Sequence, residues 1–205
     1  VNVGGAMFIA SMGSNVSLRR NLFAGNSSDD RGGAIDINCA TSGTVRFENS
    51  TFYGNGGDEV IYVCGDEVLD LVHCTFKDNI GALVNLANGD SAAGRVQWSG
   101  CIVDDPRSTS CALAAGTYLS LGGNVTTSTD ADCGLSTATD LFANPELAPG
   151  LADNGGPTAT LAIPSTSPAH DLGGPAACPA TDQRGFLRTD GSCDAGAFEL
   201  GATPP

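Results

Sequence analysis

An apolar pattern that returns four times along the chain constrains this sequence more than any other feature. Successive copies are offset by 29, 24 and 27 residues, and each copy keeps the same three apolar positions. The three columns are Val16, Val45, Leu69 and Val96; Leu18, Phe47, Leu71 and Trp98; and Phe23, Phe52, Phe76 and Val103. Because three independent columns keep one register, we expect the chain to form a coil of similar turns.

Apolar and polar residues alternate within each copy, as Val45 and Phe47 do with Arg46 and Glu48. This alternation predicts a strand with one buried face. Repeats of short strands hide their inner faces only by stacking on their neighbours. The fold class that we predict is therefore all-β, a right-handed parallel β-helix in which each column becomes a ladder along the axis.

Gly-Gly-Ala segments, at residues 4–6 and 32–34, come directly before another expected strand of the coil. We expect Met7 and Ile9 to stack on Ile35 and Ile37. Each copy ends in an asparagine, which we place at a corner with left-handed backbone; these are Asn26, Asn55 and Asn79. The Asn-x-Ser/Thr matches are Asn15, Asn26, Asn49 and Asn124. They fit glycan acceptors or ordinary turn chemistry, and we favour turn chemistry.

Composition narrows the classes of partner. The 205 residues include 28 glycines and carry a formal net charge of −14, with nine basic residues. Nucleic acid is an improbable ligand for such a chain, because phosphate backbones reward clustered lysine and arginine. No apolar run approaches the roughly 18 residues that span a bilayer. Since the sequence opens within a repeat, we expect Val1 to be a processed or truncated end.

The regular period covers only part of the chain. We assign residues 1–110 to regular coils and residues 111–205 to irregular, loop-rich coils that continue the same solenoid. Leucine and isoleucine recur through the second part, so we interpret it as packed loops. Residues 193–200 should form a closing strand that caps the coil.

Eight cysteines without a Cys-x-x-Cys pair favour disulfides over a zinc site, and therefore an oxidising compartment. We expect pairing in sequential order: Cys39 with Cys64, Cys74 with Cys101, Cys111 with Cys133, and Cys178 with Cys193. The second pair is doubtful, because both side chains face inward on stacked strands, where near-parallel Cβ vectors strain a bridge. Two buried free thiols are the alternative.

Several C-terminal motifs occur in a fixed order. They are Leu151-Ala-Asp-Asn-Gly-Gly-Pro-Thr158, Ser167-Pro-Ala-His-Asp-Leu-Gly173, Cys178-Pro-Ala-Thr-Asp-Gln-Arg-Gly185 and Cys193-Asp-Ala-Gly-Ala-Phe-Glu199. Together they resemble the C-terminal signature of bacterial right-handed parallel β-helix proteins of the choice-of-anchor Q type. One departure is His170, where that family usually has an aliphatic residue.

The resemblance implies a secreted or cell-envelope protein of bacteria, extracellular or periplasmic, in which a variable anchoring tail follows the last motif. Only Gly201-Ala-Thr-Pro-Pro205 follows here, so we expect that an anchor was removed or not included. No activity transfers with the signature. Function must be argued from sites and not from the fold.

The densest charged constellation lies in the same region. It consists of Asp171, Asp182, Arg184, Arg188, Asp194 and Glu199. We predict that an arginine of this cluster forks onto a carboxylate and fixes the end of the chain. The alternative is an exposed recognition patch. His170 lacks a suitably placed nucleophile motif, so no catalytic triad is predicted.

Parallel β-helices often host polysaccharide lyases and hydrolases, which use paired carboxylates. The candidates for such a site are Asp58, Glu59, Asp66, Glu67, Asp70, His73, Asp104 and Asp105. The chain lacks the Asn-Thr-Asp, His-Gly and Arg-Ile-Lys elements that a polygalacturonase-like site needs, so we assign no catalytic residue. Asp130 to Asp132 could bind Ca²⁺, but no EF-hand or calcium nonapeptide is present, and we assign no metal or cofactor site.

From the sequence we expect a non-catalytic secreted or cell-surface β-helical module for adhesion, display or assembly with other envelope components. Assembly would use the open N-terminal end, where unpaired strand edges can pair with another chain. The alternative is a protein that binds or cleaves polysaccharide. We expect no nucleic acid partner and no membrane span.

Overall fold

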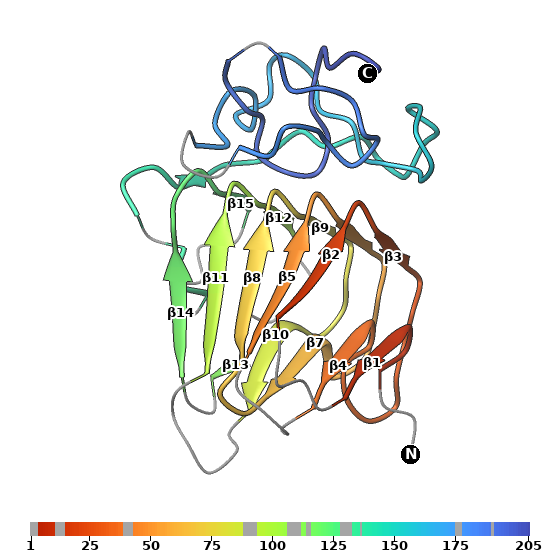
Figure 1. Cartoon of the computed structure of the whole chain (residues 1–205), viewed down its shortest axis with the longest axis vertical. Coiled ribbons are helices and arrows are strands. Elements are labelled where there is room, and N and C mark those ends of the chain that lie inside the picture. The colour runs from red at the N-terminus through yellow and green to blue at the C-terminus, as the bar shows by residue number, and fades with distance from the viewer. Residues whose placement is uncertain are drawn as a thin grey trace.

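The computed structural model describes residues 4–10, 15–38, 43–87, 94–105, 112–113, 116–127, 133–135, 137–174, 178–189 and 191–205. These residues form a parallel β-helix with three sheets along one axis (Figure 1). No α-helix occurs among them, and thus no helix long and apolar enough to cross a membrane. The predicted fold class is confirmed.

Each coil contributes one strand to each sheet, and all strand pairs are parallel. The first sheet has the order β1 (Met7–Ile9), β4 (Ile35–Ile37), β7 (Glu59–Cys64), β10 (Ala82–Ala87) and β13 (Ala112–Leu113). The second has the order β14 (Thr117–Ser120), β11 (Arg95–Ser99), β8 (Val68–Val72), β5 (Thr44–Glu48) and β2 (Val16–Arg19). The third has the order β16 (Leu141–Phe142), β15 (Val125–Thr126), β12 (Ile102–Asp104), β9 (Thr75–Lys77), β6 (Thr51–Tyr53) and β3 (Leu22–Ala24).

The predicted columns are the inner ladders of these sheets. Val45 pairs with Val16 and Leu69, and Phe52 pairs with Phe23 and Phe76. The phenylalanine rings stack down the axis, with centroids of Phe23 and Phe52 5.0 Å apart and those of Phe52 and Phe76 4.6 Å apart. The predicted pairing of Met7 with Ile35 and of Ile9 with Ile37 is also confirmed.

The asparagines at the ends of the copies form a ladder of their own. Asn55 Oδ1 accepts hydrogen bonds from the backbone and side-chain nitrogens of Asn26, and Asn79 Oδ1 accepts the same two bonds from Asn55. Asp105 ends the ladder by accepting from Asn79. Left-handed backbone at these asparagines was a wrong prediction: the residues before them, Gly25, Gly54 and Asp78, have the positive φ angles. Each asparagine side chain can therefore form hydrogen bonds with the neighbouring coil.

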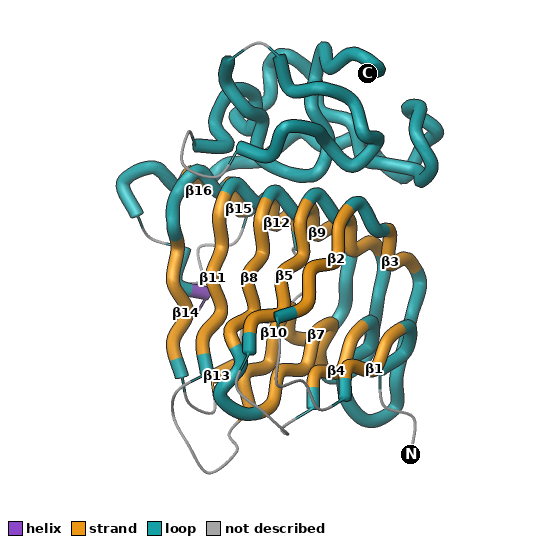
Figure 2. The backbone as a smooth tube through the Cα atoms, viewed as in Figure 1, coloured by secondary structure: helices purple, strands orange, loops and turns teal. Residues whose placement is uncertain are grey.

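The C-terminal part departs from the predicted cap. Residues 143–205 are called here the flanking segment. Its described residues are almost entirely loops and turns, and they run along the side of several coils (Figures 1 and 2). The predicted closing strand at residues 193–200 is absent; these residues form bends and turns. At the end of the solenoid, Leu135 is buried in the main core instead.

Candidate functional site

The flanking segment meets the coils at the corner between the second and third sheets. Arg20, Asn49, His73 and Gly100 occupy this corner in successive coils, and all have left-handed backbone with φ between 48° and 60°. The left-handed residue turns the chain sharply from one sheet into the next. The result is a column of turn residues that exposes side chains and carbonyl oxygens to the flanking segment.

Hydrogen bonds join this column to the flanking segment along the axis. Asn49 Nδ2 donates to the carbonyl oxygen of Thr181 (2.6 Å), and the Gly196 amide donates to the carbonyl oxygen of Gly100 (2.7 Å). Two residues after Asn49, Thr51 Oγ1 donates to Gln183 Oε1 (2.6 Å). We call this set of contacts the seam.

Outward apolar residues seal the seam. Ile102 and Val125 point away from the inner core, because their neighbours Val103 and Thr126 face inward, yet both are fully buried. They form a second apolar cluster with Ile163, Ala169, Ala195 and Phe198 of the flanking segment. The flanking segment is therefore packed onto the coils and shares a core with them.

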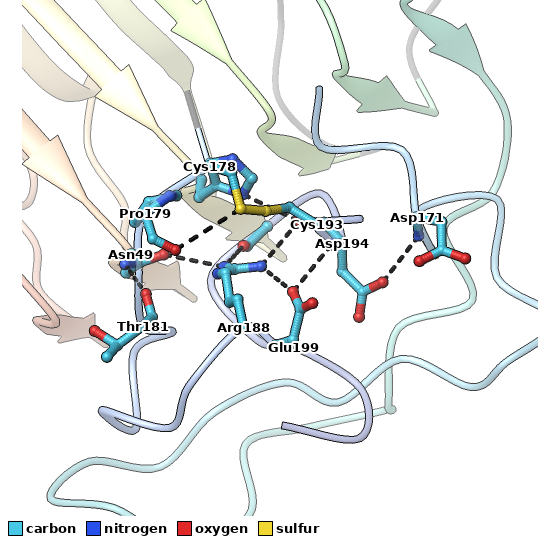
Figure 3. Close-up of a disulfide and its surroundings, with 11 residues drawn as sticks. Asn49, Asp171, Cys178, Pro179, Thr181, Arg188, Cys193, Asp194 and Glu199 are labelled. Carbon is cyan, nitrogen blue, oxygen red and sulfur yellow. Dashed lines mark hydrogen bonds and ion pairs between the residues drawn. A yellow bond between two sulfur atoms is a disulfide. The ribbon is translucent and has the colours of Figure 1, made fainter. Parts of the chain in front are cut away.

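Arg188 and Glu199 form the central ion pair of the predicted charged cluster, and each side chain is 1% exposed (Figure 3). Arg188 also donates to Asn49 Oδ1 (3.0 Å) and to the carbonyl oxygens of Gly196 (2.9 Å) and Asp194 (3.2 Å). Burial lowers the pKa of Arg188, while the charges of Glu199, Asp182 and Asp194 oppose that shift. One guanidinium thus links a coil corner to two turns of the flanking segment.

Arg184 and Asp182 form a second buried pair. Arg184 Nε donates to Asp182 Oδ2 (2.7 Å), and Nη2 donates to the carbonyl oxygen of Glu199 (2.6 Å). The guanidinium lies over the ring of Phe198, 3.9 Å from its centroid. This geometry holds the turn at Asp182 against the end of the chain.

Asp194 connects the cluster to Asp171. Its Oδ1 accepts from the Asp171 amide (2.9 Å) and its Oδ2 from the Leu200 amide (2.6 Å), while burial raises its pKa. The Asp171 carboxylate itself is about half exposed, and His170 Nδ1 lies 3.5 Å from it. The structure therefore brings all six predicted cluster residues together, with Asp171 at the edge.

His170, Asp171 and Asp194 are also the described residues best placed to hold a metal ion, with donor atoms within 4.8 Å of one another. The predicted acidic loop Asp130 to Asp132 lies outside the described residues.

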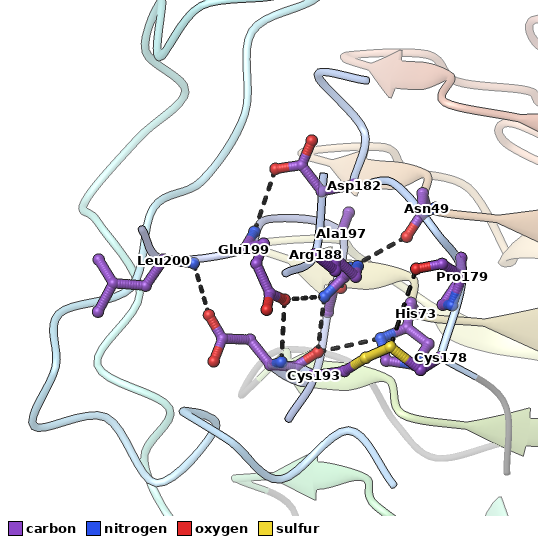
Figure 4. Close-up of polar contacts among 12 residues, drawn as sticks. Asn49, His73, Cys178, Pro179, Asp182, Arg188, Cys193, Ala197, Glu199 and Leu200 are labelled. Carbon is purple, nitrogen blue, oxygen red and sulfur yellow. Dashed lines mark hydrogen bonds and ion pairs between the residues drawn. A yellow bond between two sulfur atoms is a disulfide. The ribbon is translucent and has the colours of Figure 1, made fainter. Parts of the chain in front are cut away.

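His73 lies beneath the flanking segment, fully buried, with Nδ1 3.0 Å from the carbonyl oxygen of Asp194 (Figure 4). Burial, reinforced by the positive charge of Arg188, lowers its pKa to about 3. The ring is thus neutral at physiological pH, and we infer that Nδ1 carries the proton that it donates to the Asp194 carbonyl. Sequence reasoning had nominated His73 for catalysis, and the structure places it in the seam.

The other catalytic candidates are spread over the coils. Asp70 pairs with Arg46 (2.5 Å) and Asp104 with Lys77 (2.8 Å). Glu59 is buried and accepts from the Gly32 amide (3.0 Å). Asp105 accepts from Asn79, and burial raises its pKa to about 6. These groups therefore form hydrogen bonds or ion pairs with residues of neighbouring coils.

The remaining catalytic candidates are Asp58, Asp66 and Glu67. Asp58 and Asp66 are exposed at opposite ends of β7, and Glu67 is buried. A pair of carboxylates that acts on one glycosidic bond lies within roughly 10 Å. An extended strand as long as β7 separates its two ends by more than this distance. Asp58 and Asp66 therefore do not form such a pair.

The cysteines follow the predicted pairing in part. Cys178 and Cys193 form a disulfide within the flanking segment (Figure 3). Cys64 and Cys133 are disulfide-bonded, and their predicted partners Cys39 and Cys111 lie outside the described residues.

The predicted bridge between Cys74 and Cys101 is absent; both are buried free thiols. They occupy a corner column in which side chains accept backbone hydrogen bonds from the preceding coil. Cys101 Sγ accepts from the Cys74 amide, Ser50 Oγ from the Asn21 amide and Asn124 Oδ1 from the Cys101 amide. A thiol can fill this role, whereas a disulfide needs Cβ vectors that converge, and those of residues stacked in register are nearly parallel.

A cavity of about 750 Å³ opens between the last coils and the flanking segment. Leu121, Leu141, Leu172 and Thr139 line it, together with Asp171 and the Cys178–Cys193 disulfide. Sequence reasoning missed both the cavity and the seam. The available signal was the apolar outward residue in each of two strands, Ile102 and Val125, where alternation predicts polar residues.

Comparisons of this chain with protein-family models, curated proteins and solved structures found no match. The resemblance of residues 151–199 to the choice-of-anchor Q signature therefore stays a prediction.

Proposed function

We propose that this chain is a rigid, non-catalytic β-helical module of the bacterial cell envelope or its exterior, which presents its outer surface and loops to other envelope components. The observation that carries the proposal is how the nominated catalytic groups are used. Asp70, His73, Asp104 and Asp105 contact neighbouring coils or the flanking segment and do not converge on one point.

Two further features support an extracellular setting. A disulfide fastens the loop-rich flanking segment, and persistent disulfides are typical of oxidising compartments. The C-terminal motifs also resemble those of secreted or envelope β-helix proteins.

The proposal is tested with the purified chain, cell-envelope fragments and a panel of neutral and acidic polysaccharides. We expect saturable binding to envelope fragments and no new reducing or unsaturated sugar ends. Asp58→Asn and Asp66→Asn remove the two exposed catalytic candidates, and we expect the variants, like the parent chain, to release no new sugar ends. Turnover of any polysaccharide that disappears in one of these variants would instead support the polysaccharide-cleaving alternative.

A further inference from the structure

The cavity between the last coils and the flanking segment has the properties of a small-ligand site. Its volume of about 750 Å³ falls in the range of ligand pockets, which are mostly apolar with a few polar groups. Leu121, Leu141 and Leu172 supply apolar wall, and Leu121 is 53% exposed and Leu141 37%. An aliphatic chain placed here would cover side chains that now face solvent.

The described residues that line the cavity carry a negative charge and no formal positive charge. Among the described residues that line it, Asp171 is the only one with a formal charge, since both cysteines are in a disulfide. Its side chain is 49% exposed, and the neighbouring group is His170, whose Nδ1 lies 3.5 Å from the carboxylate. No described lysine or arginine lines the wall, so an anionic ligand would find no counter-charge there.

The polar atoms around Asp171 suit a group with several hydrogen-bond donors. Ser99 and Thr139, which carry hydroxyl groups, line the cavity together with Asp171. A primary ammonium group carries three hydrogen-bond donors and no acceptor, whereas a quaternary ammonium has no donor. We propose that this cavity binds a primary alkylammonium group, with Asp171 as its counter-ion and Leu121, Leu141 and Leu172 against its aliphatic chain.

Two sources offer this chemistry, namely a free alkylamine and a lysine side chain of another protein. The inference goes beyond the proposed function, since an envelope module can act without it. The two proposals can fail separately. If the cavity bound no alkylammonium, the binding of envelope fragments would be unaffected, and if polysaccharide turnover were found, the binding of alkylammonium in the cavity would be unaffected.

The test is an NMR titration of the full chain with hexylammonium, hexanol and hexanoate, which share a chain length and differ in head-group charge. We expect hexylammonium to shift the Gly122, Gly123 and Leu172 amide signals saturably, hexanol to bind more weakly and hexanoate not to bind. N-acetyl-lysine amide is the arm for a protein lysine: saturable shifts at the same signals would identify a lysine as a source, and their absence would leave the free amine as the source.

Asp171→Asn should weaken hexylammonium binding about tenfold, the effect of losing one charge-assisted hydrogen bond. Asparagine tolerates the left-handed backbone at this position, so the fold should be kept. Asp153→Asn removes the same charge from an exposed turn of the flanking segment and should leave binding unchanged. Equal binding of hexanol, an unaffected Asp171→Asn variant, or saturation of the site by Zn²⁺ or Ca²⁺ with no response to hexylammonium would each overturn the proposal.

Discussion

The coils and the flanking segment are stabilised in opposite ways. In the coils the main contacts recur from copy to copy, as in the stacked phenylalanines and the asparagine ladder. In the flanking segment the contacts follow no repeat, and two buried arginine–carboxylate pairs, Arg188 with Glu199 and Arg184 with Asp182, hold the turns together. Repetition spreads stabilisation over many equivalent residues, whereas the flanking segment concentrates it in a few buried polar groups.

The two regions also differ in how they bury polar atoms. The recurring buried polar groups of the coils are neutral amides, whose hydrogen bonds run from one coil to the next, and single carboxylates such as Glu59 and Asp105 are buried among them. The flanking segment buries two arginine–carboxylate pairs, and the desolvation cost of each charge is offset only while its partner is present. We therefore expect single substitutions in the seam to be more damaging than comparable changes on the coil surface.

The largest effect should follow loss of Arg188. Arg188→Met leaves the Glu199 carboxylate buried without its partner, which should cost about 3–5 kcal/mol in the free energy of unfolding. Chemical denaturation at neutral pH measures this. Arg19→Met is the control, because Arg19 is 62% exposed in its ion pair with Glu48 and should contribute less than about 1 kcal/mol. Equal effects of the two substitutions would remove the distinction between the regions.

The double variant Arg188→Met with Glu199→Gln sharpens this result. Since it removes both charges, it should be more stable than Arg188→Met alone. If the loss of unfolding free energy in the double variant equals the sum of the losses in Arg188→Met and Glu199→Gln, the two residues do not act as a pair.

The next effect is acid sensitivity through His73. Its folded pKa of about 3 lies below its ordinary value of 6.5. The unfolded chain therefore takes up the proton first as the pH falls, so stability is complete above pH 6.5 and decreases toward pH 3. Between pH 7 and pH 4 this group alone should remove up to roughly 3 kcal/mol.

His73→Asn tests this because asparagine accepts the left-handed backbone and does not titrate in this range. The decrease in unfolding free energy from pH 7 to pH 4 should be smaller in His73→Asn than in the parent chain. The carboxyl groups contribute equally to both and cancel. An identical decrease in the two proteins would show that His73 does not titrate on unfolding.

A smaller effect of opposite sign is expected in the coils. Burial raises the folded pKa of Asp105 to about 6, above its ordinary value of 3.8, so this group favours the folded state at low pH and that contribution is lost as the pH rises through 6. Asp105→Asn would extend the ladder with the residue type found at Asn26, Asn55 and Asn79. It should raise the unfolding free energy at pH 7 by about 1–3 kcal/mol, and by almost nothing below pH 4.

Asp104→Asn is the matched control for this prediction. Asp104 lies next to Asp105 but forms a partly buried ion pair with Lys77 (2.8 Å). Its loss should destabilise the chain slightly at pH 7. A stabilising effect of both substitutions would point to relief of the overall negative charge and not to the ladder.

The inner wall of the coils was predictable from sequence because burial on one face imposes a period of two, and stacking imposes the same register on each copy. The columns of Val45 and Phe52 needed no other information. The seam depends on contacts such as Asn49 with Thr181 and His73 with Asp194, which join distant parts of the chain without any shared pattern. The cluster around Arg188 could be nominated from its composition, but its buried position could not.

We infer that the charged cluster fastens the flanking segment to the coils. Hydrogen exchange measured by mass spectrometry on the parent chain and on Arg188→Met tests it most directly. We predict that Arg188→Met speeds exchange most in residues 181–200 and at the corner residues Asn49, His73 and Gly100, while the inner strands β5, β6 and β8 stay protected. Unchanged exchange in residues 181–200, or equal acceleration throughout the coils, would contradict the claim.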